Sequence, residues 1–319
     1  MERAPMIAAT LARKPSEPSM AFFHASMAIV AAVFALFAAA SLVSADLSFH
    51  PAQLSTRLAI GVVPCLIVAA YSHWRGYVRV RDGVLAAIWA GVFNGLSYFP
   101  MYAAARSRLP LRDHLLARLD ARLGLQVPAV LGWFERNAAA RHLLAASYDL
   151  LMPMMICAAV VTAFFGPIRA IKRYIVSVAV AICLAIPVSW ACPAVGPWVT
   201  YGFHPNAGQA ACAQFLGRLR QPGPFTIDMD YTAGLIAFPS FHAILAALAC
   251  IALWSVPKLR APAAILCALI VCSTVATGWH YVADALGGIV FAALAHAGAT
   301  LFLAVETKRA ARSARQLAM

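Results

Sequence analysis

Long apolar runs separated by short polar segments dominate this chain. A helix needs ~20 mostly apolar residues to cross the hydrocarbon core of a bilayer. Because runs of this kind recur along the whole sequence, they predict an all-α fold, a polytopic bundle of about eight transmembrane helices. We place the spans at residues 22–45, 58–74, 84–105, 142–165, 174–193, 239–256, 261–278 and 281–304.

The composition agrees with a membrane protein, since 63% of the residues are hydrophobic and only 12% are charged. A net charge of +13 is also found in proteins that bind nucleic acid. Here the basic residues lie in the gaps between apolar runs, where they act as topology signals. We therefore expect the lipid bilayer as a partner and no nucleic acid, and the oligomeric state stays open.

The distribution of basic residues also predicts an orientation. Eight spans place both termini on the same side, and that side would carry most of the 25 Lys and Arg residues. Cytoplasmic loops carry such an excess. We expect a multi-pass protein of the cell (inner) membrane with cytoplasmic termini and an opposite face toward the periplasm or the exterior.

Two longer polar segments fall on that opposite face. Segment 106–141 places Leu111, Leu115, Leu119 and Leu123 on one helical face, which fits either a helix on the membrane surface or one packed on the bundle. Segment 194–238 is rich in Pro, Gly and Asn and predicts an ordered or partly ordered loop. Cys192 and Cys212 flank its first part, so a disulfide on this oxidising side is one possibility.

One candidate for chemistry is His242, in the sequence "FPSFHA" where a loop enters the sixth span. Pro239 suits a first helical turn because its missing N–H would be unpaired there. The free backbone N–H groups of Ser240, Phe241 and His242 would then offer an anion site.

A second candidate is the sequence "HYVAD", at the start of the last span. His280 and Asp284 are four residues apart and share a helical face. The carboxylate can accept the Nδ1–H of the imidazole and leave Nε2 free as a nucleophile or base. Counting the crossings places His242 and His280 at the same membrane face, so we expect one site. Phosphoryl transfer needs such a set: a nucleophile, an acid for the leaving oxygen and donors around the phosphate.

These residues resemble two motifs of the type-2 phosphatidic acid phosphatase superfamily of membrane phosphoesterases. "PSFH" at 239–242 is similar to its Pro-Ser-Gly-His motif, and Ser273-Thr274 through His280 and Asp284 to its Ser-Arg-x5-His-x3-Asp motif. The resemblance implies a phosphohistidine at His280, an orienting role for Asp284 and a general acid at His242. It implies no cofactor and no metal.

The resemblance also divides the chain. It implies a six-helix core over 84–304 after two additional helices in 21–83, with a tail at 1–20 and a basic cytoplasmic tail at 305–319. Ser240, Phe241, Ser273 and Thr274 would bind substrate.

Thr274 replaces the arginine and Phe241 the glycine of the motifs, and the family's first motif, Lys-x6-Arg-Pro, is not found. These departures resemble the inositol phosphorylceramide synthase branch of inositolphosphotransferase-like enzymes. Arg218, Arg220 and Arg57 are candidate phosphate-binding cations, although ordinary loop charges are the commoner role.

The sequence therefore predicts a membrane enzyme that transfers phosphoryl groups of lipid phosphates or phospholipid head groups, as a lipid phosphatase or a phosphotransferase. A transporter with a His/Asp proton relay would instead place acids at mid-bilayer in paired halves. Metal binding by His242, His280 and Asp284 is a third alternative that residue types do not separate.

Overall fold

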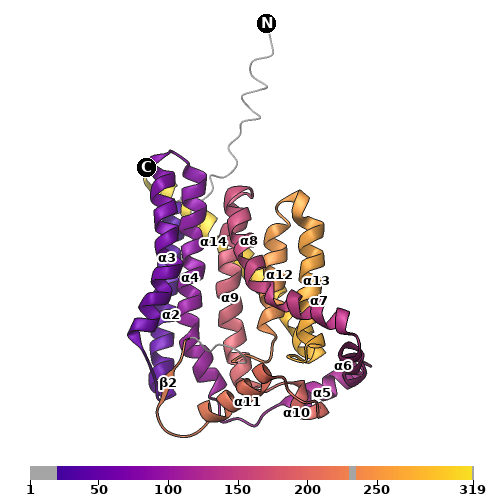
Figure 1. Cartoon of the computed structure of the whole chain (residues 1–319). Helices are drawn as coiled ribbons and strands as arrows, with labels where there is room; N and C mark the ends of the chain where they lie inside the picture. Colours follow the sequence, from indigo (N-terminus) through magenta and orange to yellow (C-terminus); the bar gives the residue numbers. More distant parts are fainter. Residues whose placement is uncertain (1–19, 230–234, 318–319) are drawn as a thin grey trace.

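The computed structural model describes residues 20–229 and 235–317, which form a bundle of long helices (Figure 1). Apart from Met20, the predicted N-terminal tail lies outside the described residues. Among the residues that the structure describes, six helices are long and apolar enough to cross a membrane. They are α2 (Met20–Ser44), α3 (Pro51–Trp74), α4 (Val78–Ala105), α9 (Ile168–Ala191), α13 (Arg260–Ala276, preceded by the 3₁₀ turn Pro257–Leu259) and α14 (Val282–Leu317).

Two further predicted spans are less regular. The span at 142–165 consists of α7 (Ala138–Asp149) and α8 (Leu151–Phe164), whose axes are bent by 45° at Leu150. Counted together they make up to seven long spans. The predicted span 239–256 is the shorter apolar helix α12 (Phe241–Leu253). The fold class, a polytopic helical membrane bundle, is confirmed.

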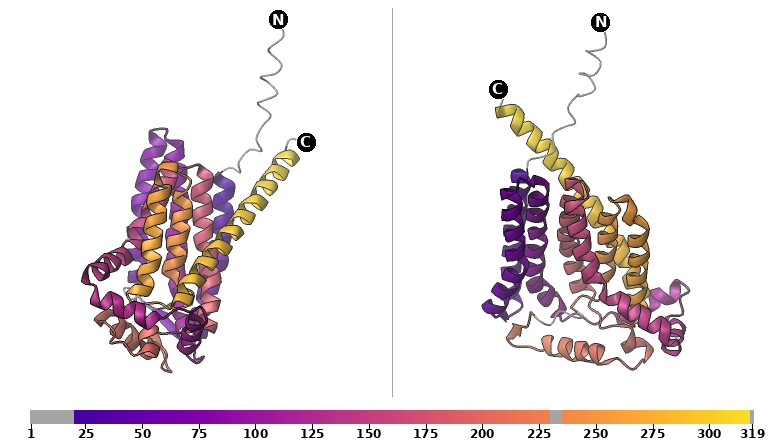
Figure 2. Two further views of the ribbon diagram at one scale, coloured as in Figure 1. Left: turned by 90° about the vertical axis from the view of Figure 1, so that its right-hand side faces the viewer. Right: turned by 45° about the horizontal axis from the view of Figure 1, so that its top comes forward.

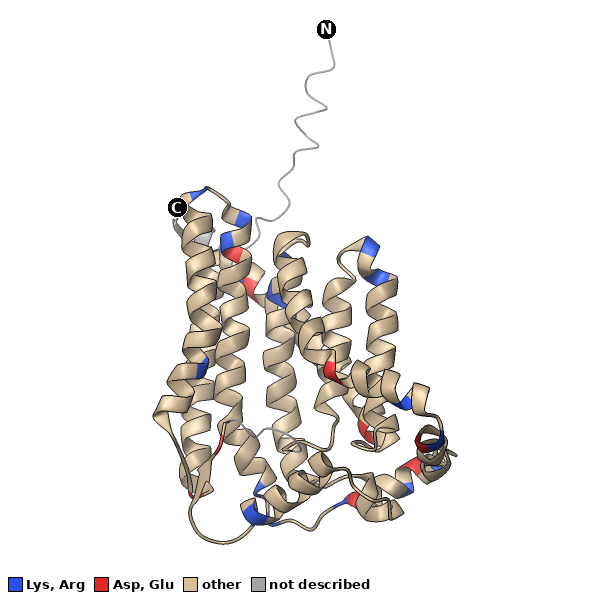
Figure 3. Ribbon diagram, viewed as in Figure 1, with Lys and Arg blue, Asp and Glu red and all other residues tan. Residues whose placement is uncertain are grey.

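The last helix is longer than the apolar pattern predicts. Residues 305–317 of the expected basic tail continue α14 as regular helix. Figure 2 shows α14 inclined to the other long helices and projecting beyond them. Most of the Lys and Arg positions lie toward the two ends of the bundle (Figure 3), as is usual for a membrane protein.

Short elements gather at one end of the bundle, the lower end in Figure 1. They are α5 (Asp113–Arg122), α6 (Val127–Arg136), α10 (Pro197–Tyr201), α11 (Ala207–Leu219) and the strands β1 (Leu47–Phe49) and β2 (Phe225–Ile227). The two strands pair in parallel, with Leu47 opposite Phe225. The segment predicted as a loop over 194–238 thus contains two helices and a strand, and Cys192 and Cys212 are thiols rather than a disulfide.

Segment 106–141 combines the two arrangements considered for it. Leu111, Leu115 and Leu123 of the predicted leucine face are exposed, whereas Leu116 is buried in a cluster with Tyr281. Helix α5 therefore packs on the start of α14 mainly through the face that carries Leu116, and not through the leucine face predicted from the sequence.

The centre of the bundle is α9, which contacts α4, α8, α12 and α14. Its small and branched residues, such as Ile171, Ile175 and Ala185, are fully buried. By contrast α3 packs mainly on α4 and exposes an apolar surface, as expected of a helix that faces lipid. The predicted additional helices in 21–83 correspond to α2, α3 and the first residues of α4.

Candidate active site

His242 lies in the first turn of α12, at the end of the bundle where the short elements gather. Ser240 is the N-cap residue, and its Oγ accepts the backbone N–H of Ala243 at 3.3 Å. The imidazole stacks on the ring of Tyr148, with 4.2 Å between centroids and 21° between planes. Cap and stacking together fix the direction of the His242 ring.

His280 lies in the turn between α13 and α14, two residues before α14 begins. Gly278 has a φ of +76°, a conformation that favours glycine, and this turn reverses the chain direction. The N–H of His280 donates to the carbonyl of Thr274 at 3.0 Å. The His280 and His242 ring centroids are 6.3 Å apart. The structure thus brings the two histidines of the sequence prediction together, from separate helices.

Asp284 lies in the first turn of α14 and is fully buried. Its Oδ2 is 3.4 Å from Nδ1 of His280 and accepts the N–H of Tyr281 at 3.0 Å. The 3.4 Å contact is longer than a normal hydrogen bond, and Nδ1 has no hydrogen-bond partner among the described residues. Burial lowers the pKa of His280 to about 4, and the backbone carbonyl of Ala237 opposes this shift. The imidazole is therefore neutral at pH 7, the state in which it can act as a nucleophile.

A pair of glycines in α14 allows the two histidine-bearing segments to approach. A Cβ on Gly288 would stand 2.6 Å from the carbonyl oxygen of Ser240 and 2.7 Å from Cβ of Ala243. A Cβ on Gly287 would lie 3.1 Å from the ring of Phe238. Ser240 also donates its N–H to the carbonyl of Asp284 at 3.0 Å. The start of α12 therefore rests directly on the backbone of α14.

Both histidines line a cavity of about 420 Å³ between α4, α7, α8 and α12. Its wall is largely apolar and includes Phe241, Trp279 and Leu245. Tyr148 and Asp149 also face it, so Asp149 takes part in the cavity wall. Among the described residues that line it there is no Lys or Arg. The cavity can therefore accept an apolar ligand that carries one polar group to the histidines.

The other residues predicted to bind substrate lie elsewhere. Ser240, Ser273 and Thr274 are fully buried and do not line the cavity. The hydroxyls of Ser273 and Thr274 donate to the helix carbonyls of Ile270 and Val271, at 2.6 and 2.7 Å. They stabilise the end of α13, from which the His280 turn starts.

The three candidate cations are also outside the cavity wall. Arg218 is exposed on α11, and Arg220 donates to the carbonyl of Leu109 at 2.6 Å. The third candidate, Arg57, lies closer to the site: it donates to the hydroxyl of the cavity residue Tyr98 at 3.3 Å and also lies over its ring. Within the described ranges 20–229 and 235–317, no group of three His, Cys, Asp or Glu side chains is arranged to hold a metal ion.

The sequence of residues 114–298 matches the PAP2 superfamily, a match over more than half of the chain that includes His242, His280 and Asp284. The chain belongs to the PAP2 superfamily. No curated protein and no solved structure matches it. As a PAP2 superfamily member it is a membrane enzyme of the phosphatase type.

In this PAP2 protein, sequence reasoning missed two buried carboxylates on α5. Asp120 accepts the N–H groups of Val282 and Ala283 at 3.0 and 2.7 Å, at the N-terminus of α14. Burial raises the pKa of Asp120, and the hydrogen bonds from Ala283 and Val282 oppose the shift. A carboxylate at a helix N-terminus also complements the helix dipole. Asp120 therefore fixes the first turn of α14 beside His280.

Asp113 is the second of these carboxylates. Its Oδ1 accepts the N–H groups of Val195 and Gly196 at 3.1 and 2.9 Å and the hydroxyl of Tyr281 at 3.2 Å. Asp113 and Asp120 are seven residues apart, two helical turns, so both point from one face of α5. That spacing was a signal in the sequence, although the leucine pattern drew attention to the other face.

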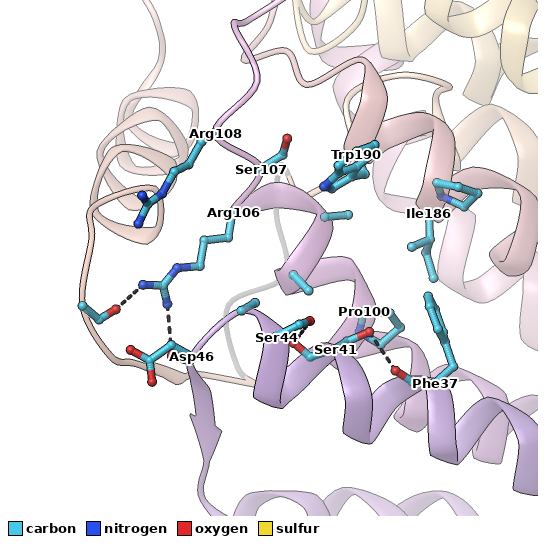
Figure 4. A pocket seen from close by; sticks show the side chains of 15 residues that line it. Phe37, Ser41, Ser44, Asp46, Pro100, Arg106, Ser107, Arg108, Ile186 and Trp190 are labelled. Carbon is cyan, nitrogen blue, oxygen red and sulfur yellow. Dashed lines mark hydrogen bonds between the residues drawn. The ribbon is translucent and has the colours of Figure 1, made fainter.

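The PAP2 protein has a larger cavity that holds neither histidine. It measures about 630 Å³, lies between α2, α4 and α9, and includes Phe37, Ile186 and Trp190 (Figure 4). At its polar end the guanidinium of Arg106 donates to the carbonyls of Asp46 and Gly223. These bonds tie α4 to two loops, so Arg106 has a structural role there.

Proposed function

We propose that this protein transfers phosphoryl groups of lipid phosphates or phospholipid head groups through a phosphohistidine intermediate. The observation that carries the proposal is the pair of histidines, 6.3 Å apart between ring centroids, in the wall of a mainly apolar cavity. A lipid ester has an apolar chain for the cavity and a single phosphate for the histidines. The membership of the PAP2 superfamily supports phosphoester chemistry.

The proposed reaction has two steps. Nε2 of His280 attacks phosphorus, the bond from phosphorus to the ester oxygen breaks, and His242 gives its proton to the leaving alkoxide. Asp284 stabilises the positive charge that forms on His280. Water or an alcohol then attacks the phosphohistidine, returns a proton to His242 and breaks the P–N bond. The protein is a phosphatase when water accepts and a transferase when an alcohol accepts.

The geometry supports the roles proposed for His242, His280 and Asp284. His242 and His280 both face the cavity, and Asp284 lies against the far nitrogen of His280. We further propose that the cavity opens toward the periplasm or the exterior, because the side with the most Lys and Arg would be cytoplasmic. The departures from the family motifs, Phe241 and Thr274, make an alcohol acceptor such as inositol part of this proposal.

The test uses full-length purified protein and lipid phosphates labelled at phosphorus. We expect wild type to release or transfer label and His280→Ala to lose at least about 1,000-fold in turnover, because a nucleophile is removed. His204→Ala removes an exposed loop histidine and serves as the matched control. Full turnover of His280→Ala would refute the assigned nucleophile.

Two inhibitors separate the proposal from a metal-dependent reaction. Vanadate mimics the phosphorane and should inhibit wild type, whereas a chelator should leave turnover unchanged. The opposite pattern would favour a metal bound by the histidines. Comparing release of labelled phosphate with transfer to added inositol then distinguishes a phosphatase from a transferase.

A further inference from the structure

A third cavity, of about 530 Å³, lies between α9, α12 and α14. It is lined by the first turns of α9, through Arg173 and Ser177, and by residues at and beyond the end of α12, through Ser255. His242 is at the opposite end of α12. The cavity therefore belongs to the membrane face opposite the two histidines and is separate from the proposed catalytic site.

Four polar atoms on this cavity are buried without a hydrogen-bond partner among the described residues. They are Nε of Arg173 and the hydroxyl oxygens of Tyr174, Ser177 and Ser255. Tyr174 is 5% and Ser177 only 1% exposed, so bulk water does not satisfy them. These atoms have almost no accessible surface, so a ligand in the cavity reaches them only after the side chains rotate. Because buried polar groups normally have a partner, four unpaired atoms on residues of one wall make this wall a candidate for polar contacts.

The charged residues around the cavity indicate whether that ligand is an anion or a cation. Arg173 lines it from α9 and supplies the positive charge, and His296 lines it from α14. Among the described residues that line the cavity there is no Asp or Glu. Arginine donates in a planar fork that suits phosphate, and each hydroxyl can donate one further hydrogen bond. The wall therefore suits an anion with several oxygen atoms.

The remaining wall is apolar and partly exposed on the outside of the bundle. Trp254 and Ile251 line the cavity and are 48% and 38% exposed. In a membrane protein, side chains that are exposed on the outside of the helix bundle contact lipid. An anion whose apolar part extends past Trp254 would thus fit both halves of the wall.

We propose that this cavity binds a phosphate group, held by Arg173, Tyr174, Ser177 and Ser255, on the membrane face opposite the catalytic histidines. The phosphate is that of an anionic phospholipid or free inorganic phosphate, and the experiment below distinguishes the two. The site does not depend on the proposed reaction, because it shares no residue with the catalytic cavity.

The experiment measures retention of anionic lipid by native mass spectrometry of the full chain. The protein is taken from vesicles of phosphatidylglycerol and phosphatidylcholine, in a His280→Ala background so that lipid is not consumed. A second arm titrates detergent-purified protein with inorganic phosphate and follows the thermal midpoint. Arg173→Gln removes the cation, and Tyr174→Phe removes one unpaired hydroxyl with little change in packing.

The matched control is Arg169→Gln, which removes the same charge one turn away at an exposed position outside the cavity. We expect wild type and Arg169→Gln to retain phosphatidylglycerol or to be stabilised by phosphate, and Arg173→Gln to bind at least about tenfold more weakly, the effect of losing a charge-assisted hydrogen bond. Tyr174→Phe should weaken binding by less. Retention of phosphatidylglycerol would show that the bound phosphate is that of a phospholipid. Stabilisation by inorganic phosphate without lipid retention would show that the site binds the free anion. Equal loss in Arg169→Gln and Arg173→Gln, or no preference for either anion in wild type, would overturn the proposal.

Discussion

The most informative perturbation outside the proposed catalytic residues is Asp120→Asn on α5. Asp120 is fully buried and accepts two backbone N–H groups at the N-terminus of α14, at 3.0 and 2.7 Å. The asparagine side chain has nearly the same shape but only one acceptor oxygen. Its NH₂ group would face one of the two N–H groups, which would then be buried without an acceptor. The substitution therefore changes hydrogen bonding while it leaves no space behind.

A buried donor left unpaired costs about 1–3 kcal/mol of stability. For domains of 150–250 residues, 1 kcal/mol shifts Tm by about 2–4 °C, so we expect Asp120→Asn to lower Tm by roughly 2–12 °C. The first turn of α14 follows His280 directly, and a catalytic group displaced by about 1 Å can lose 100-fold in rate. We therefore expect turnover to fall by about 10- to 100-fold, with a smaller change in KM.

The assay follows phosphate release from a lipid phosphate and thermal unfolding in the same detergent. Glu135→Gln, at an exposed position on α6, removes one acidic charge from a neighbouring helix and is the control. Loss of turnover at temperatures far below the Tm of the variant separates positioning from unfolding. If Asp120→Asn matched Glu135→Gln in both Tm and turnover, the assigned role of this carboxylate would be wrong.

Three further predictions follow from the site. Gly288→Ala would place a methyl group 2.6 Å from the Ser240 carbonyl and should cost about 1–3 kcal/mol and most of the activity, whereas Gly298→Ala, on the same helix, should keep both in the same assays. The pKa of His280, about 4 against an ordinary 6.5, means that the unfolded state binds more protons between these values. His280 should therefore contribute a loss of about 3 kcal/mol of stability as pH drops from 6.5 to 4, and His280→Asn, followed by thermal unfolding, should reduce the pH dependence by that amount; an unchanged slope would contradict the buried neutral histidine. Tyr281→Phe should reduce turnover less than Asp120→Asn. Asp113 loses only the phenol as a donor and keeps its two hydrogen bonds from backbone N–H groups.

The sequence by itself determined the class of the fold. Runs of apolar residues long enough to cross a bilayer fix the helices, because no backbone polar group can stay unpaired in hydrocarbon. It also indicated the two histidines whose ring centroids the structure places 6.3 Å apart, since a proline-led helix start and a His/Asp pair at helical spacing are local features. The spacing did not fix that His280 would precede α14 rather than begin it.

Only the tertiary structure decided which distant groups support that site. Asp120 accepts hydrogen bonds from the backbone of residues 282 and 283, and Asp113 from the loop after α9. Every residue except proline has a backbone N–H, so the sequence does not indicate which of these groups a distant carboxylate will bind. The positions of Arg218 and Arg220 outside the cavity likewise depend on how α11 packs. Hydrophobic period and helix-start signals are short-range properties of the chain, whereas hydrogen-bond partners across a bundle depend on the packing of helices that are far apart in sequence.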